Sequence, residues 1–454
     1  MAGGALPGFR DFYPDEFAHR AHIMRAWREV ARRYAFVEYD GPPLEPLDLY
    51  TRKSGDEIVG QLYNFTDKGD RQVALRPEMT PTFARMVAAR ANGLRKPVRW
   101  FSIPQLFRYE RAQRGRLREH FQLNVDIVGE PSEVADAELL TVAIDCMREL
   151  GLTSADVQAR VSDRRLLTAM LDAIAVTSDA AIAAVLLTLD KAGKEQEPTG
   201  VTRLTTAGLT AAQAAAVFSW TRSDYSIEHV RREFANQPGV LQHLALLDSY
   251  FAHLSALGVG DWVRLDLSIV RGLAYYTGIV FELFDAKGEL RAICGGGRYD
   301  NLLKELGGVD LPALGFGMGD VVLGELLKER GLMSRAVPAR PDLFVIGGPG
   351  APTEGMAGAL KLIGALRAAG FSVDYGLSDK KYQAPPRGQF ETAQKAGALA
   401  AIYYDGTGAI TVKGVGGKFA DAPTLQLPAP GLLSGAADIT AQLTTFISSL
   451  SSNV

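Results

Sequence analysis

The 454-residue sequence predicts an α+β fold, with an antiparallel sheet core flanked by helices, a helical insertion and a separate C-terminal α/β domain. Three observations carry this prediction. Two runs of alternating apolar and polar residues enclose an arginine-rich stretch, an alanine-rich helical pattern separates two strand-rich blocks, and the C-terminal part alternates between strand and helix patterns. The length allows two or three domains of ordinary size.

Changes in residue pattern place the predicted boundaries. The first strand-rich block spans 1–164, the helical insertion spans 165–258, and strands resume over 259–330. The segment 331–341 contains "SRAVPARP" and is predicted to be a linker. The small α/β domain then takes up 342–454.

The composition excludes several classes of protein. A formal net charge of -3 and a pI near 6.1 exclude a generally basic nucleic-acid-binding surface, so any nucleic acid must meet a local patch. The sequence has two cysteines, no apolar signal region and no apolar run of membrane-spanning length, which together predict a cytoplasmic protein without a membrane partner.

Motifs for covalent or zinc chemistry are missing from the sequence. None of the six histidines stands at metal-ligand spacing from Cys or Asp, and no residue is predicted to bind a metal. The sequence also has no G-x-S-x-G motif and no Walker A loop. If the chain is an enzyme, we expect its chemistry to rest on positioning and electrostatics.

The N-terminal elements follow from periodicity. An amphipathic helix is predicted over 14–36, with Ile23, Trp27 and Val30 on one face. The run 61–77 predicts two strands around a turn at "DKGD", and Thr80 is the predicted N-cap of the next helix.

Two further strands, 99–110 and 119–130, are predicted to flank the arginine-rich loop. Alternation puts Arg108 and Glu110 on one face of the first strand. The second strand has an apolar face with Phe121, Leu123, Val125 and Ile127, and a polar face with Gln122, Asn124 and Asp126. The polar face suits a small polar ligand, and a solvated face of a half-exposed sheet explains it equally well.

Several segments resemble, in order, the motifs of class II aminoacyl-tRNA synthetases of the histidyl-tRNA synthetase family. The stretch "RYERAQRGRLREHFQ" resembles motif 2, while "VRGLAYYTGIVFE" and "GGGRYDNL" resemble the histidine-specific motifs. "GFRDFYPDE", "LRPEMTPTFAR" and "ALGFGMGD" fit the same family. The resemblance implies a class II core and a C-terminal anticodon-binding domain.

The resemblance implies a histidine–tRNA ligase with ATP and L-histidine as substrates. Histidine would be activated to histidyl-adenylate with release of pyrophosphate and then transferred to the 3' end of tRNA(His). The amino-acid carboxylate is itself the nucleophile, so the protein must align the reactants and neutralise phosphate charge, a task that suits arginine. Mg²⁺ is implied by the ATP chemistry.

By the same resemblance, Arg108 and Arg271 are expected to be catalytic at the α-phosphate. Arg108 thus also belongs to the expected ATP-binding residues, and Arg116 is expected at the β- and γ-phosphates. The motif implies a contact between Glu110 and the adenine amino group. Phe121 is expected to stack on adenine.

Two departures from the family concern the ATP site. Because "REHFQ" replaces "REFHQ", His120 is the alternative to Phe121 as the stacking ring. Motif 3 usually ends in an arginine for the ATP tail, but Val322 stands at that position here, with Asp320 nearby.

For histidine, the resemblance implies contacts to both ends of the amino acid. The α-amino group is expected to meet Glu78, Thr80 and Gln122. Asp126 and Tyr276 are expected at the two imidazole nitrogens, because a carboxylate and a hydroxyl can satisfy both. Tyr299 is expected to line the same pocket.

An alternative function and an assembly also follow from the resemblance. The alternative is the catalytically inert, histidine-binding paralogue that serves as regulatory subunit of ATP phosphoribosyltransferase. The valine at 322 favours it, whereas Arg108, Arg116 and Arg271 favour the enzyme. The segment around Pro42 resembles motif 1 and implies a two-fold homodimer.

Overall fold

The computed structural model describes residues 4–54, 56–109, 113, 115–192, 195–222, 224–270, 276–335, 338–347, 355–404, 409–415, 422–428 and 437–451. The chain forms two compact units, Met1–Val337 and Pro338–Val454. The division falls inside the segment that was predicted to be a linker. Among the described residues, no helix is long and apolar enough to cross a membrane.

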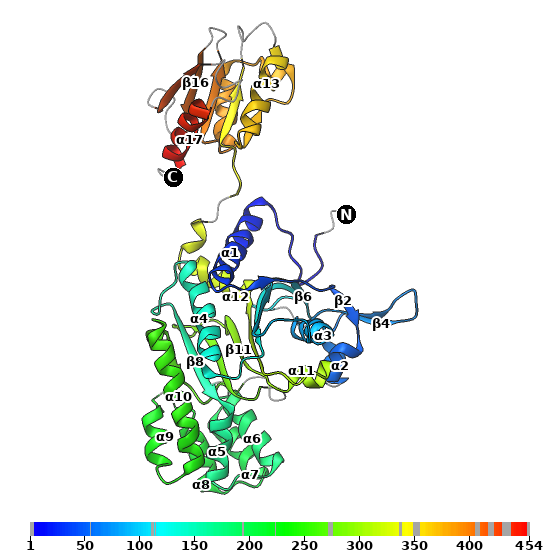
Figure 1. Ribbon diagram of the computed structural model, residues 1–454, viewed down its shortest axis with the longest axis vertical. Helices are drawn as coiled ribbons and strands as arrows, with labels where there is room; N and C mark the ends of the chain where they lie inside the picture. Colours follow the sequence, from blue (N-terminus) through cyan, green and yellow to red (C-terminus); the bar gives the residue numbers. More distant parts are fainter. Residues whose placement is uncertain are drawn as a thin grey trace. The chain divides into compact units, whose positions relative to one another are not determined.

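A nine-stranded sheet forms the centre of the first unit and confirms the predicted α+β class (Figure 1). The strand order is β1-β5-β7-β12-β11-β10-β8-β9, and β6 pairs with β7 beside this path. Pairing is antiparallel except between β1 and β5 and between β8 and β9. The strands are β1 (Val37–Glu38), β5 (Val98–Ser102), β6 (Gln105–Phe107), β7 (Glu119–Val128), β8 (Val157–Asp163), β9 (Val263–Leu265), β10 (Ile279–Asp285), β11 (Cys294–Arg298) and β12 (Ala313–Gly319).

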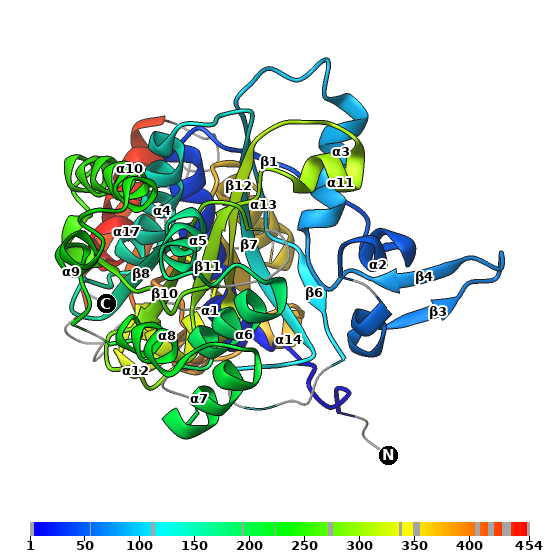
Figure 2. The same cartoon turned by 90° about the horizontal axis from the view of Figure 1, so that it is seen from below.

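One face of this sheet is covered by helices. Helix α4 (Glu133–Glu149) packs on β7, β11 and β12, with α1 (Pro14–Arg33) and α10 (Pro238–Ala256) against it and α12 (Asp320–Glu329) beside α1 (Figure 2). The predicted amphipathic face of α1 is confirmed, since Ile23, Trp27 and Val30 are buried.

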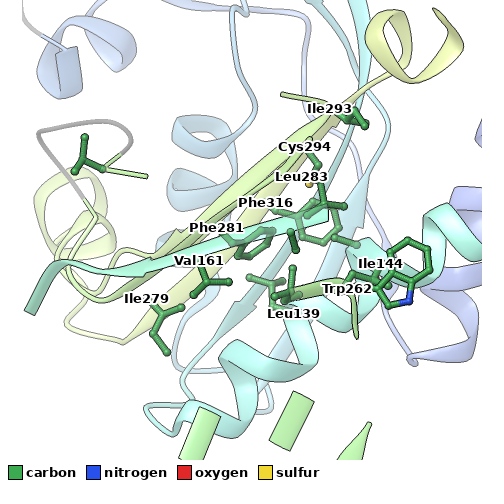
Figure 3. Packing of buried hydrophobic residues seen from close by; sticks show 14 of the residues in the cluster. Leu139, Ile144, Val161, Trp262, Ile279, Phe281, Leu283, Ile293, Cys294 and Phe316 are labelled. Atoms are coloured by element: carbon green, nitrogen blue, oxygen red, sulfur yellow. The ribbon is translucent and has the colours of Figure 1, made fainter. Parts of the chain in front are cut away.

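The contact between this face and α4 is mainly apolar, and it also holds a buried ion pair between Asp136 of α4 and Arg298 of β11. Phe281 of β10 and Phe316 of β12 lie together, with ring centroids 6.2 Å apart, and Leu139 and Ile144 of α4 pack in the same cluster (Figure 3). The helices therefore bury the apolar residues of the alternation, and the opposite face is left for the polar ones.

The predicted continuous strand over 99–110 is wrong. It divides into β5 and β6, which pair with opposite ends of β7. Pro104 lies at the break and has no N–H to donate to a strand ladder. Its carbonyl instead accepts a hydrogen bond from the backbone N–H of Gln122 at 3.1 Å.

A small three-stranded sheet and a helix pair lie toward the other face. The predicted turn at "DKGD" is confirmed, because β3 and β4 form a hairpin in which Asp67 accepts hydrogen bonds from the N–H groups of Gly69 and Arg71. Thr80 is not the N-cap, because it is the first residue of α3 and Met79 precedes the helix. The elements are β2 (Leu44–Pro46), α2 (Asp48–Ser54), η1 (Asp56–Gln61), β3 (Asn64–Thr66), β4 (Gln72–Leu75), α3 (Thr80–Arg90) and α11 (Leu302–Gly307).

The stretch between β8 and β9 is helical, as predicted. Asp163 ends β8 and starts the first helix by accepting hydrogen bonds from the N–H groups of Arg165 and Leu166. Buried residues of these helices belong to the same hydrophobic cluster as the sheet, so the helical stretch packs as part of the first unit. Its elements are α5 (Arg164–Ala173), α6 (Asp179–Asp190), α7 (Glu197–Thr206), α8 (Ala211–Ser219), α9 (Ile227–Glu233), α10 and η2 (Gly260–Trp262); η3 (Leu332–Arg335) follows α12.

The second unit has a five-stranded sheet in the order β14-β13-β15-β16-β17. The predicted alternation of strands and helices is present, and β17 is an additional strand that pairs with β16. The elements are β13 (Leu343–Ile346), α13 (Gly355–Ala368), β14 (Val373–Tyr375), α14 (Asp379–Tyr382), α15 (Pro386–Lys395), β15 (Ala400–Tyr404), β16 (Ala409–Gly414), β17 (Thr424–Pro428) and α17 (Ala437–Ser451).

Candidate active site

Glycines make room for polar side chains on the face of the large sheet opposite α4. Gly315, Gly317 and Gly319 of β12 stand opposite Asp126, Asn124 and Gln122 of β7. A Cβ atom on Gly315 would lie only 2.1 Å from Oδ1 of Asp126, and one on Gly317 would lie 2.8 Å from Cδ of Gln122. The polar side chains of β7 therefore lie across the bare backbone of β12.

One end of this glycine-lined face is covered. Helices α3 and α11 pack against each other, and their buried residues Phe83 and Leu302 form one cluster with Val98 and Val128 of the sheet. Tyr299 belongs to the same cluster, and Tyr276 packs against it. We call this region the covered end.

Asp126 is the charged residue at the boundary of the covered end. Its carboxylate is buried, and Oδ1 accepts a hydrogen bond from the Tyr299 hydroxyl. Burial raises the pKa of Asp126 to about 7, although the tyrosine hydrogen bond acts in the opposite direction. The structure thus joins Asp126 with Tyr299, and Tyr276 packs against the cluster to which Tyr299 belongs.

The other end of the face opens into a cavity of about 820 Å³, which we call the open end. Arg108, Arg116, His120 and Gln122 line it, as do Gly295 and Gly317. Of the residues expected to bind histidine, Gln122 therefore reaches the cavity. Glu78 and Thr80 lie at the start of α3, where both are half-buried.

The two described arginines of the arginine-rich stretch that line the cavity are held by backbone contacts. Nε of Arg108 donates a hydrogen bond to the carbonyl of Pro77 at 3.0 Å. Arg116 and Gln113 exchange both backbone hydrogen bonds, at 2.8 and 2.9 Å, and Gly115 between them has a φ of +73°. The chain thus turns back at the cavity and brings a second guanidinium toward it.

His120, and not Phe121, faces the cavity. Burial, with Arg108 and Arg10 nearby, lowers the pKa of His120 to about 3, so its ring is uncharged. Phe121 lies on the opposite face, with its ring 4.5 Å from the guanidinium carbon of Arg20 and 6.1 Å from the ring of Phe12. The expected position of Phe121 against adenine therefore does not fit this geometry, and the alternation that grouped Phe121 with Leu123 already pointed away from it.

The departure from motif 3 has a structural counterpart. Oδ2 of Asp320 accepts a hydrogen bond from Nη1 of Arg10 at 2.9 Å, and Oδ1 accepts one from the N–H of Phe121. Arg10 also pairs with Glu119 at 2.6 Å. Asp320 therefore connects the N-terminal segment to β7. Val322, two residues further along α12, lines the cavity.

Two expected residues, Glu110 and Arg271, lie outside the described residues. The cavity contains others that the motifs did not single out, among them Arg160 of β8 and Glu282 of β10, which stand opposite each other in the sheet. Glu282 is a polar residue in the otherwise apolar run "IVFELF", and that interruption was the available signal.

In the described ranges, no group of three or more His, Cys, Asp or Glu side chains could hold a metal ion. The cavity does contain the carboxylates of Glu282 and Glu289. Both cysteines, Cys146 and Cys294, are buried and form no disulfide.

Comparisons with known proteins identify related chains over most of the sequence. Residues 8–319 match the family model described as histidyl-tRNA synthetase. The histidine–tRNA ligase of Opitutus terrae is 46% identical over 88% of this chain and 90% of its own length. The chloroplastic/mitochondrial histidine–tRNA ligase of Arabidopsis thaliana is 38% identical over 89% of this chain and 82% of its own length.

A solved structure has the same fold. The crystal structure of histidyl-tRNA synthetase from Nostoc sp. PCC 7120 superposes with a TM-score of 0.80 and covers 98% of this chain and 99% of its own. At 22% identity, this likeness supports the fold alone.

Proposed function

The chain belongs to the histidyl-tRNA synthetase family and ligates histidine to tRNA, and we propose that the glycine-lined face is where it activates histidine with ATP. The observation that carries the proposal is the arrangement of the two ends. Arginines line a cavity large enough for a nucleotide, and a buried carboxylate with a tyrosine hydroxyl lies next to it.

The open end is the proposed ATP site. Arg108 would contact the α-phosphate, where charge builds up as the histidine carboxylate attacks and pyrophosphate leaves, and Arg271 would act at the same phosphate. Arg116 would bind the β- and γ-phosphates. Because the attacking carboxylate is already ionised, preorganised guanidinium groups are sufficient to lower the barrier without a protein base.

Adenine recognition is proposed for His120 and Glu110. His120 lies on the cavity face and its ring is neutral, so it can stack on a base without a cost for burying a charge. This assignment replaces Phe121. The Glu110 carboxylate would accept a hydrogen bond from the adenine amino group, as its match in motif 2 implies.

The covered end is the proposed histidine site. Asp126 and Tyr276 would meet the two ring nitrogens, and Tyr299 would hold the Asp126 carboxylate in place through the hydrogen bond described above. Glu78, Thr80 and Gln122 would bind the α-amino group. A buried carboxylate is a strong partner for an N–H donor because the local dielectric is low.

We further propose that ATP enters as its Mg²⁺ complex. Glu282 and Glu289 offer oxygen ligands in the cavity, and Mg²⁺ commonly binds through one or two carboxylates together with substrate phosphates and water. The ion would neutralise phosphate charge. The arginines of this chain would position the phosphates.

The proposal also covers the assembly of the chain, the role of its second unit and its location in the cell. The chain would form a homodimer through the segment around Pro42, where the side chains of Val37 and Leu44 are exposed. The second unit would bind the tRNA anticodon, and the protein would act in the cytoplasm. Sedimentation equilibrium tests the first of these, because a monomeric mass would contradict the dimer.

The regulatory paralogue has less support than the enzyme. The relatives that match most of the chain at 38–46% identity carry the name histidine–tRNA ligase. The deciding measurement is histidine-dependent exchange between ATP and pyrophosphate by the purified chain. Tight histidine binding without exchange would favour the paralogue.

Two arginine variants test the site within the same assay. Arg108→Ala should lower kcat/KM for exchange by about 100- to 1,000-fold, because a preorganised donor to the developing charge is lost.

Arg271→Ala should reduce adenylation far more than histidine binding measured by calorimetry. Arg222→Ala is the matched control, since this exposed arginine pairs with Asp224 in the helical stretch. Equal losses of binding and adenylation would contradict the role of Arg271.

A further inference from the structure

Val322 raises the question of what meets the end of the ATP tail. Three segments come together at this point of the cavity wall. A Cβ atom on Gly115, at the tip of the arginine-rich turn, would lie 3.4 Å from Cγ2 of Val322 and 3.9 Å from Cδ of Arg291. Both Val322 and Arg291 line the cavity.

Arg291 comes from a part of the chain that the motifs did not single out. It lies in the connection between β10 and β11, far in sequence from the arginine-rich turn and from α12. Its side chain is exposed, and no residue in the described part of the chain forms a hydrogen bond or ion pair with it. Its guanidinium is therefore available to a ligand in the cavity.

The charges around this point make a cation there consequential. Oε2 of Glu325, one turn after Val322 on α12, would lie 3.9 Å from the same Cβ position. Glu289 also lines the cavity. Without Arg291, a polyphosphate reaching this wall would face carboxylates and a valine, and fewer guanidinium groups would offset their repulsion.

We propose that Arg291 supplies, from the β10–β11 connection, the positive charge at the ATP tail that the family supplies from the motif 3 position occupied here by Val322. The proposal rests on the proposed function, since it assumes that ATP occupies this cavity. Arginine suits the task because its planar fork can give two donors to phosphate oxygens and remains charged. Arg291 is thus a substrate-binding residue whose contribution grows with the number of phosphates.

The test compares ligands with and without the tail. Arg291→Ala should raise KM for ATP in histidine-dependent pyrophosphate exchange by about tenfold. It should leave competitive inhibition by AMP within about twofold, because AMP lacks the β- and γ-phosphates. Lys287→Ala is the matched control, because this exposed lysine lies in the same connection and does not line the cavity.

A second variant tests whether the two positions exchange roles. Adding Val322→Arg to Arg291→Ala should recover at least half of the lost ATP affinity on a logarithmic scale. Because the Val322 side chain is only 8% exposed, thermal melting must first show that the double variant folds. Arg291→Lys is a conservative single variant and should retain part of the affinity for ATP.

The possible outcomes separate this inference from the proposed function. A wild-type chain with no histidine-dependent exchange would contradict the proposed function itself. Normal exchange, with KM for ATP in Arg291→Ala within twofold of wild type, would overturn only the role of Arg291. Equal weakening of ATP and AMP would also overturn it, since the contact would then not be to the tail.

Discussion

The covered and open ends of the glycine-lined face lie on the same strands but differ in burial and charge. At the covered end, α3 and α11 exclude water and bring Tyr299 to Asp126, so the carboxylate has its partner before any ligand arrives. At the open end, arginines line the wall of a cavity of about 820 Å³. In the proposed site, a small amino acid would be selected by burial, whereas a triphosphate would be held by charge.

One cause shifts the pKa values of Asp126 at the covered end and His120 at the open end in opposite directions. Burial moves the pKa of Asp126 up to about 7, and moves that of His120 down to about 3. Desolvation disfavours the charged form in both cases. The consequences differ, because Asp126 can change its charge near neutral pH while His120 stays neutral.

The largest expected effect comes from removing the space that both ends share. Gly315→Ala would put a methyl group 2.1 Å from Asp126 Oδ1 and 2.8 Å from the carbonyl oxygen of Val125, and a backbone atom cannot move aside. We expect kcat/KM for histidine to fall by more than about 100-fold, and thermal melting to report a lower Tm.

The control for this variant is Gly239→Ala, where the added methyl group would meet nothing within 4 Å beyond the neighbouring backbone of its own helix. It should retain wild-type exchange. Wild-type kinetics in Gly315→Ala would show that the two ends do not depend on a bare strand between them.

A smaller effect is expected from changing the charge at the covered end alone. Asp126→Asn keeps the shape and removes the carboxylate, so KM for histidine should rise by about 10- to 100-fold. KM for ATP should change little, because the open end is untouched. Equal changes in both KM values would contradict the separation of the two ends.

The Asp126 carboxyl also predicts a pH dependence of stability. Its folded-state pKa of about 7 lies above the ordinary 3.8, so the protonated form is favoured by folding. Its contribution is fully present below pH 3.8 and is lost as the pH rises through about 7. In urea titrations without histidine, wild type should lose stability relative to Asp126→Asn over this window, and a constant difference would contradict the raised pKa.

The smallest effect is expected at the adenine ring. His120→Ala should raise KM for ATP by about tenfold through lost stacking, and His120→Phe should restore most of it. Because the pKa of His120 is about 3, protonation of this ring should not alter KM for ATP between about pH 6 and 8.

Phe121→Ala is the matched comparison for the adenine ring. Its ring packs against Phe12 and Arg20 on the other face of the sheet, so its removal should lower Tm while KM for ATP stays near wild type. A larger kinetic effect at Phe121 than at His120 would reverse our assignment of the two rings.

The strand at the centre of the site, with one polar and one apolar face, could be predicted from residue alternation. Alternation in 119–128 separated Gln122, Asn124 and Asp126 from Leu123 and Val125, because successive side chains of a strand point to opposite faces. The motifs carried the family resemblance and most of the residues proposed for ligand binding. These are local properties, and they can be read without knowing what packs where.

Which part of the polar face is covered and which is open depends on long-range packing. The contact between α3 and α11, the hydrogen bond from Tyr299 to Asp126, and the positions of Arg291 and Val322 beside Gly115 all join segments far apart in the chain. The periodicity of residues along the sequence does not predict such pairings, because they depend on how the helices and connections pack on the sheet. The division of one polar face into a buried end and a charged cavity is therefore a product of packing.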